Sequence, residues 1–244
     1  PSDEMPEGCL WVAYAEVPMA PARLLDVDCR AARALPGVLA AYTAEDLKLP
    51  GDAHAVEPVL LSLGPVLYAG QPAALVVADS QETARQAARL VDLRLEPGPS
   101  PWGEGSLAAE AELRHGDVDA ALGRARKIFE RSWLLSLPTI QTLGATPAVV
   151  WPDGRGGVEI LGRSPWVKRD AERMGRALGL KAEGLRLICR RAEGPWPDPR
   201  DAMDIARLAA ACLRCGEALR LVDRPGRHMA PGQARRDIRR AGLA

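Results

Sequence analysis

Apolar and polar positions in the first hundred residues alternate with the periods of short strands and short helices. Five stretches form apolar or alternating runs typical of strands: CLWVAYA (9–15), ARLLDVD (22–28), GVLAAYT (37–43), AALVVADS (73–80) and VDLRLE (91–96). CRAARAL (29–35) predicts a short helix. A longer helix is predicted after residue 80, where apolar residues follow helical spacing at Ala84, Ala87, Ala88 and Val91. Asp79 or Ser80 is expected to cap it, and Glu82 would complete a capping box with Asp79.

The pattern continues in the second half of the chain. A short helix capped by Asp117 is expected to lead into three strands: RKIFERSWLLS (126–136), ATPAVVW (145–151) and GVEILG (157–162). Ser164 as N-cap, Pro165 at the first helical position and Gly179 at the end predict the next helix. A strand at 185–190 precedes a helix at about 201–214, and ALRLVD (218–223) predicts a last strand. The inner face of the 201–214 helix is expected at Ile205, Leu208, Ala209 and Cys212.

Composition suggests where this series is divided. Residues 97–115 are rich in Pro, Gly and Ser and lack a clear period, which is typical of a boundary. We therefore expect an α+β fold with a first domain at 1–97, a linker at 98–115, a second segment at 116–223 and a tail at 224–244. The tail carries six arginines against one acid, Asp237. A frayed, solvated tail is the favoured interpretation, with a docking surface as the alternative.

Charge and cysteine usage exclude several classes of function. The 32 basic residues balance 32 acidic ones, which gives no indication of nucleic-acid or membrane binding. No stretch resembles a signal peptide or a membrane span, so a soluble cytoplasmic protein is expected. The five cysteines lack the spacing of a small secreted domain, and reduced thiols are therefore expected. The histidines at 54, 115 and 228 lie far apart and show no metal-ligand spacing.

Two short stretches are candidates for chemistry. Cys212 and Cys215 form a C-x-x-C, but at a helix C-terminus, where the helix dipole opposes a thiolate. A core role is therefore favoured. The second candidate is the corner EGPWPDPR (193–200), which follows a strand and opens a helix, as phosphate-binding loops do. Such loops need backbone N–H groups that approach the ligand, and three prolines remove three of them.

The order of segments resembles the molybdenum-binding large subunit of the xanthine dehydrogenase/aldehyde oxidase family. The matching stretches begin with EGCLWVAYAEVPMAPARLLDVDCRAARALPGVLAAYTAEDL (7–47) and LYAGQPAALVVADSQETARQAARLVDLRLEP (67–97). HGDVDAAL (115–122) and residues 151–191 continue the series, so the resemblance spans about 7–223. It implies an α/β-hammerhead domain followed by part of a molybdopterin-binding domain.

The chain departs from the family pattern where the resemblance implies cofactor contacts. The family's Gln-Glu-His and Glu-Pro stretches fall near Leu137, Pro138, Thr139, Leu143 and Gly144. Its substrate-side Gln falls near Ser164, and its GGGFGGK loop becomes EGPWPDPR, which keeps only Gly194. Trp196, Pro197 and Asp198 stand where the family has glycine-rich backbone. The family's catalytic glutamate lies beyond position 244, so no catalytic, metal or cofactor-binding residue is expected in this chain.

Three functions remain open at this point. The favoured one is a non-catalytic relative that acts as a scaffold or interaction subunit beside molybdenum hydroxylase subunits. The second is the N-terminal piece of a split enzyme that hydroxylates an aldehyde or N-heterocycle, with another large-subunit fragment as partner. Only then would molybdopterin, or molybdopterin cytosine dinucleotide, be held. The third is an unrelated binding module. None implies a nucleic acid or a membrane as partner.

Overall fold

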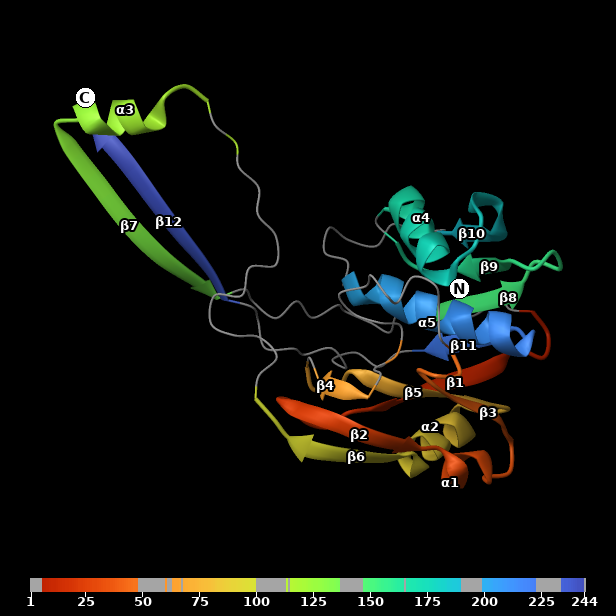
Figure 1. Ribbon diagram of the computed structural model, residues 1–244. Helices are drawn as coiled ribbons and strands as arrows, with labels where there is room; N and C mark the ends of the chain where they lie inside the picture. Colours follow the sequence, from red (N-terminus) through yellow and green to blue (C-terminus); the bar gives the residue numbers. More distant parts are fainter. Residues whose placement is uncertain are drawn as a thin grey trace. The chain divides into compact units, whose positions relative to one another are not determined.

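The computed structural model describes residues 6–47, 60, 63–66, 68–99, 113, 115–136, 147–164, 166–189, 199–222 and 234–243. The chain forms two compact units (Figure 1). Unit 1 consists of Pro1–Pro101 and Gln141–His228, and unit 2 of Trp102–Ile140 and Met229–Ala244. These two compact units do not coincide with the successive domains expected at 1–97 and 116–223. Those domain boundaries stay a prediction.

Unit 1 contains helices and strands from both halves of the sequence, in a mixed arrangement that confirms the predicted α+β class. The first half supplies β1 (Leu10–Glu16), β2 (Ala22–Asp28), α1 (Arg30–Arg33), β3 (Val38–Thr43), β4 (Gly64–Val66), β5 (Pro72–Ala78), α2 (Gln81–Leu90) and β6 (Asp92–Pro97). The second half supplies β8 (Pro147–Pro152), β9 (Val158–Leu161), α4 (Val167–Leu178), η2 (Ala182–Gly184), β10 (Leu185–Ile188), α5 (Pro199–Cys215) and β11 (Leu219–Val222).

One seven-stranded sheet joins the two halves in the order β10-β9-β8-β11-β1-β5-β3. The junction is a parallel pair in which Leu10 of β1 lies opposite Leu219 of β11. A separate three-stranded sheet has the order β4-β2-β6. The late strand β11 thus lies between β8 and β1, so β1, β3 and β5 of the first half share one sheet with β8 to β11 of the second half.

The largest core cluster also draws on both halves. Tyr14 and Leu75 of the first half pack in the same cluster as Ile160 and Leu208 of the second. The Tyr14 hydroxyl donates a hydrogen bond to the backbone oxygen of Asp204, at 3.1 Å. All four residues predicted for the inner face of α5 are buried: Ile205, Leu208, Ala209 and Cys212. Burial of this apolar face, rather than helix propensity alone, is what fixes α5 on the sheet.

The helix caps agree with the sequence only in part. Ser80 is the N-cap of α2 and its hydroxyl accepts a hydrogen bond from the Thr83 N–H at 3.1 Å, so the capping box with Asp79 does not form. Helix α4 begins at Val167 with Trp166 as N-cap, and the expectation of Ser164 as N-cap is wrong. Gly179 ends α4 in the left-handed conformation, with φ 68°, as predicted.

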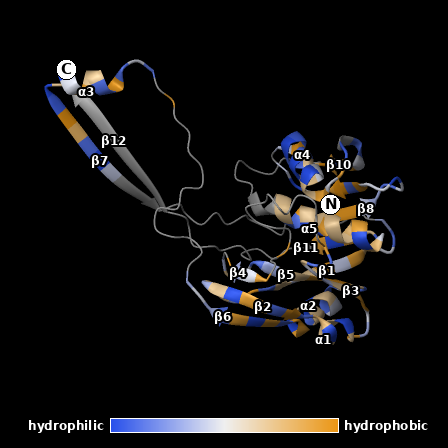
Figure 2. Cartoon of the chain, viewed as in Figure 1, coloured by the Kyte–Doolittle hydropathy of each residue, from blue (hydrophilic) through white to orange (hydrophobic). Residues whose placement is uncertain are grey.

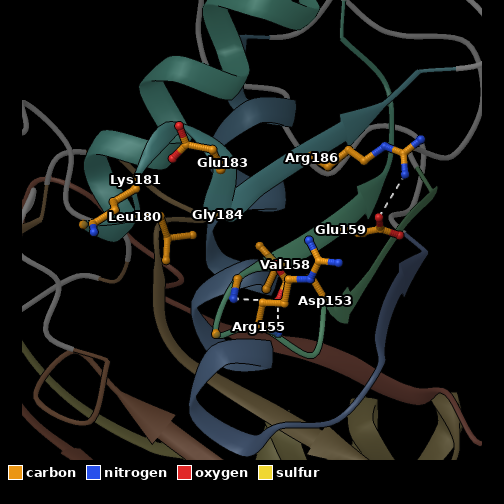
Figure 3. A pocket seen from close by; sticks show the side chains of 12 residues that line it. Asp153, Arg155, Val158, Glu159, Leu180, Lys181, Glu183, Gly184 and Arg186 are labelled. Carbon is orange, nitrogen blue, oxygen red and sulfur yellow. Dashed lines mark hydrogen bonds and ion pairs between the residues drawn. The ribbon is translucent and has the colours of Figure 1, made fainter.

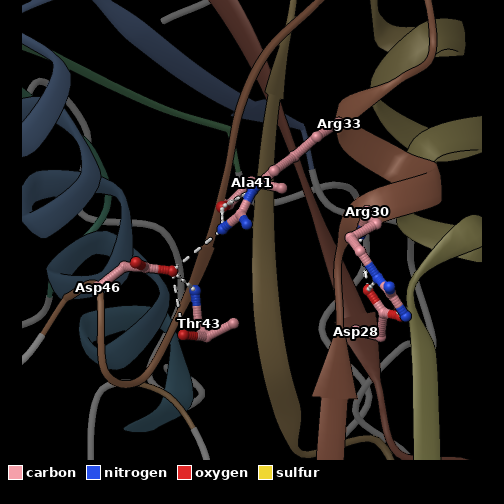
Figure 4. Close-up of polar contacts among 6 residues, drawn as sticks. All are labelled: Asp28, Arg30, Arg33, Ala41, Thr43 and Asp46. Carbon is pink, nitrogen blue, oxygen red and sulfur yellow. Dashed lines mark hydrogen bonds and ion pairs between the residues drawn. The ribbon is translucent and has the colours of Figure 1, made fainter.

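Side chains close the outer edge of β3, which is the last strand at one end of the seven-stranded sheet (Figure 4). The Arg33 guanidinium donates to the Ala41 carbonyl at 2.7 Å. The Asp46 carboxylate accepts from the Thr43 N–H at 2.8 Å and also pairs with Arg33 at 3.3 Å. Backbone groups two residues apart point to the same side of a strand, so both contacts occupy the side away from β5.

Unit 2 contains α3 (Val118–Arg124), β7 (Lys127–Ser136) and β12 (Ala234–Leu243). The Asp117 carboxylate caps α3 by accepting from the Ala120 N–H at 2.9 Å, as predicted. Strand β12 pairs antiparallel with β7 from Ala234 opposite Ser136 to Leu243 opposite Lys127. The expectation of a frayed tail is therefore wrong for these ten residues, because the strand β7 provides them with backbone partners that the arginine-rich sequence does not reveal.

In the part of the chain that the structure describes, no helix has both the length and the apolar character needed to cross a bilayer.

Candidate functional site

Most of the positions where the family resemblance implies cofactor contacts lie outside the described part of the chain. These are Gly194, Trp196, Pro197 and Asp198 in the loop, and Thr139 in the earlier stretch. The flanking elements follow the expected order, since β10 ends at Ile188 and α5 begins at Pro199. Ser164 is the predicted position that the structure does describe.

Ser164 lies buried between β9 and α4, with 7% of its surface exposed. Its hydroxyl donates to the Asp170 carboxylate at 2.7 Å and accepts from the Trp166 N–H at 3.1 Å. The Ser164 carbonyl accepts from the Cys189 thiol at 3.5 Å. The hydroxyl and the carbonyl of this residue are thus committed to contacts inside the protein.

This geometry does not fit a contact with a cofactor or substrate. The resemblance places a glutamine here, whose long side chain ends in an amide that can both donate and accept. Ser164 is shorter, and its single hydroxyl proton is directed to Asp170, which is itself 7% exposed. A buried carboxylate without a hydrogen bond is costly, so the Ser164 hydroxyl stabilises Asp170 and is not available to a ligand.

The C-x-x-C pair at the end of α5 is structural, as the sequence analysis favoured. Cys212 is fully buried, and burial raises the pKa of its thiol to about 12, with smaller contributions from Cys215 and Cys9. Burial also raises the pKa of Cys215. Because the thiolate is the nucleophile and the metal ligand, these thiols are poorly suited to either role near neutral pH.

The described residues also form a cavity of about 750 Å³ that the sequence analysis missed (Figure 3). The turn after β8 and the segment from Gly179 to Arg186 line it. Asp153 in the turn accepts from the N–H groups of Arg155, at 2.7 Å, and Gly157, at 2.8 Å, and these bonds lower its pKa. Glu159 accepts from Arg186 at 3.0 Å. The carboxylates of Asp153 and Glu159 are therefore satisfied within the wall. The glycine-rich stretch DGRGG was the signal that could have located this cavity.

Gly157 shows how closely the wall of this cavity is packed. A Cβ atom at this position would lie 2.3 Å from the backbone oxygen of Gly184. Glycine is therefore required by close approach of the two backbones, and not by a ligand. Within the described ranges, no group of three or more His, Cys, Asp or Glu side chains is arranged to hold a metal ion.

The first part of the chain has the fold of an α/β-hammerhead domain. Residues 2–99 match the sequence model of the aldehyde oxidase and xanthine dehydrogenase a/b hammerhead domain. The N-terminal part of the chain, residues 2–99, is therefore similar to the hammerhead domain of the aldehyde oxidase and xanthine dehydrogenase family.

Curated relatives support this similarity along most of the chain. Xanthine dehydrogenase 1 of Arabidopsis thaliana is 26% identical over 202 residues, which cover 76% of this chain and 14% of that protein. The nicotine 6-hydroxylase large subunit of Paenarthrobacter nicotinovorans is 26% identical and covers 61% and 22%. The carbon monoxide dehydrogenase large chain of Afipia carboxidovorans is 38% identical over 38% of this chain and 12% of its own length. The chain thus spans about a fifth or less of these relatives.

Solved structures show the same fold. The reconstituted CO dehydrogenase from Oligotropha carboxidovorans superposes with a TM-score of 0.75 at 21% identity, over 97% of this chain and 34% of that one. The aldehyde oxidoreductase from Desulfovibrio gigas gives a TM-score of 0.71 at 20% identity, over 94% and 28%.

Proposed function

We propose that this chain is a non-catalytic member of the family that acts as a scaffold or interaction subunit and does not itself hold molybdopterin. The observation that carries the proposal is the Ser164–Asp170 hydrogen bond, 2.7 Å long and buried at both ends. At this position the family resemblance implies a side chain that faces the substrate, whereas here the side chain stabilises its own helix.

The sequence of the corner before α5 supports the same conclusion. EGPWPDPR replaces a glycine-rich loop whose backbone approaches the cofactor. Pro195, Pro197 and Pro199 each fix φ near −65° and lack a donor N–H. Trp196 adds a large rigid side chain where a bulky anionic cofactor needs room. The sequence thus lacks the N–H donors and the small residues of a glycine-rich loop, and this supports the proposed loss of cofactor binding.

The family similarity supports protein partners in general. Relatives include the large subunit of nicotine 6-hydroxylase and subunit gamma of the 6-hydroxypseudooxynicotine dehydrogenase complex, both from Paenarthrobacter nicotinovorans. A chain of this family that keeps the fold without the cofactor contacts would retain surfaces for such assembly. The third hypothesis from the sequence, an unrelated binding module, is overturned by the match of residues 2–99 to the hammerhead domain.

The second candidate is a split enzyme, in which another polypeptide supplies the remaining large-subunit domains. The observation in its favour is that 97% of the chain keeps the fold of the CO dehydrogenase chain, with a TM-score of 0.75. A molybdopterin group, supplied with that second fragment, would then provide the oxygen-transfer chemistry. Ser164 would have no direct part in it, because its hydroxyl is bound to Asp170.

Elemental analysis and pterin fluorescence test the main proposal. The protein purified from cells that make the cofactor should contain no stoichiometric molybdenum and release no pterin on denaturation. Stoichiometric molybdenum and pterin in the isolated chain would overturn it. Purification together with native partners then separates the two candidates: a large-subunit fragment carrying molybdenum and pterin supports the split enzyme, whereas a complete hydroxylase supports the scaffold.

A further inference from the structure

Helix α4 carries a strong excess of positive charge on its exposed side. Its exposed charged residues are four cations and one anion: Lys168, Arg169, Arg173, Arg176 and Glu172. Its second carboxylate, Asp170, is buried against Ser164. Figure 2 shows α4 largely in the hydrophilic colour. The chain as a whole has equal numbers of acidic and basic residues, so this helix represents a local separation of charge.

A groove runs along α4 beside the segment that follows it. Its volume is about 560 Å³. The floor is apolar or small, formed by Ala171, Gly175, Leu180 and Leu185. The rim carries Lys168, Arg176 and Lys181, with Glu172 as its acid. Lys181 and Leu180 also line the neighbouring cavity of Figure 3, so the segment after α4 separates two hollows.

The cations of the rim are available to a ligand. Arg176 donates to the backbone carbonyl of Glu172 at 3.3 Å. Within the described part of the chain, Lys168, Arg176 and Lys181 form no ion pair with a carboxylate. By contrast, Arg186 on the neighbouring strand is paired with Glu159 at 3.0 Å. The groove thus combines a rim of three cations and one acid with an apolar floor.

We propose that this groove binds an acidic, amphipathic segment of a protein partner. Carboxylates would pair with the rim, and apolar side chains would enter the floor between Gly175 and Leu180. A phosphate backbone would use the cations but gain nothing from the apolar floor, which makes a peptide the better match. The inference rests on the proposed interaction role and names the surface and the chemistry of the partner.

Gly175 provides a means to block the groove without disturbing the helix. A Cβ atom added there would meet only the Leu180 backbone oxygen, at 3.9 Å, which is an ordinary contact. Alanine and leucine are also better helix formers than glycine, by about 1 kcal/mol. Gly175→Leu should therefore fill the groove while the thermal stability of the protein stays equal or rises, and Gly175→Ala should do so to a smaller extent.

Fluorescence anisotropy with a labelled synthetic helical peptide of leucine and glutamate tests the proposal on the full chain. We expect binding that weakens with salt, and a loss of affinity of about tenfold or more when Lys168, Arg176 and Lys181 are all changed to Glu. The matched control changes Arg23, Arg89 and Arg94, which are exposed elsewhere in unit 1, to Glu. Gly175→Leu should weaken binding and the control triple should not.

Several results would overturn the inference. They are an equal effect of the two triple variants, unchanged affinity in a folded Gly175→Leu protein, or equal binding of a peptide with lysine in place of glutamate. Preferential binding of duplex DNA or of phosphatidylserine vesicles would also overturn it, in favour of those partners. Molybdenum and pterin content is measured separately, so cofactor in a chain that still binds the peptide would refute the scaffold proposal alone.

Discussion

At the scale of single residues, Ser164 shows that the sequence can single out a polar residue by its position along the chain. Its role, however, could not be predicted from that position. The sequence predicts that Ser164 is the N-cap of α4 and stands at a former cofactor-side position. The structure instead places it two residues before the cap, where it binds both the Trp166 N–H and the Asp170 carboxylate. The i+6 contact depends on how the chain enters the helix, which the hydrophobic pattern does not encode.

Replacement of Ser164 by Ala should lower the free energy of unfolding by about 1–3 kcal/mol, because the buried Asp170 carboxylate loses a donor. Denaturant unfolding measures this change. Asp170→Asn keeps an oxygen that accepts the Ser164 proton, and should therefore cost less. An Ala variant as stable as the parent protein would show that Asp170 is satisfied without Ser164, and would weaken the argument against a ligand role for the hydroxyl.

Asp28 provides a pH-dependent contribution to stability. The Arg30 side chain donates hydrogen bonds that lower the pKa of the Asp28 carboxyl from 3.8 to about 2, assisted by the Arg30 N–H. A depressed folded-state pKa stabilises the protein above the unfolded value, and this contribution is lost as the pH falls through about 2. In an NMR titration, Arg30→Gln should move the Asp28 midpoint towards 3.8, whereas Arg23→Gln on the same strand β2 should leave it in place.

At the scale of elements, local patterns predicted helices and strands well where burial is one-sided. The apolar face of α5 and the alternation in β6 are examples, since each depends on residues close together in sequence. The pattern missed β4, which has three residues. It also missed the pairing of β12 with β7, because half of the residues of β12 are charged and the strand gives no alternating apolar signal. Of the cofactor corner, the sequence predicted the strand–loop–helix order, and its loop lies outside the described residues.

The edge of β3 illustrates an interaction between elements. Arg33 from α1 and Asp46 after β3 cover the Ala41 carbonyl and the Thr43 N–H, and open edges of this kind pair readily with other chains. Arg33→Ala should therefore increase self-association, measured by light scattering as a function of concentration. Arg30→Ala is the matched control on the same helix, because Arg30 pairs with Asp28 and not with the edge. Equal association of both variants would contradict the protective role.

At the scale of the whole molecule, unit 1 is built from two segments that lie far apart in the sequence. The local sequence pattern could not predict that they combine. The order β8-β11-β1 is determined by pairs such as Leu10 with Leu219, and no local period reports such pairs. The family resemblance located the hammerhead domain but treated the two halves as successive domains. Their shared sheet and shared core make them one structural unit in the described residues.

A fragment of residues 1–101 should accordingly be much less stable than unit 1 in the full chain. It would lose the β1–β11 pair and the bond from Tyr14 to the Asp204 carbonyl. Denaturant unfolding followed by circular dichroism should show a lower midpoint or no cooperative transition. Addition of a separate polypeptide covering residues 141–228 should restore it, and a fragment that unfolds like the full chain would contradict the prediction.

The position of β11 also has a consequence for synthesis on the ribosome. Strand β1 leaves the ribosome before its parallel partner β11, which is made about 200 residues later, and this interval takes roughly 10 to 40 s at ordinary translation rates. During that interval the edge of β1 that later binds β11 has no native partner within the sheet. Slowing translation between residues 100 and 219 should therefore increase the yield of aggregated nascent chains, and chaperone capture would be needed longest by the segment that carries β1.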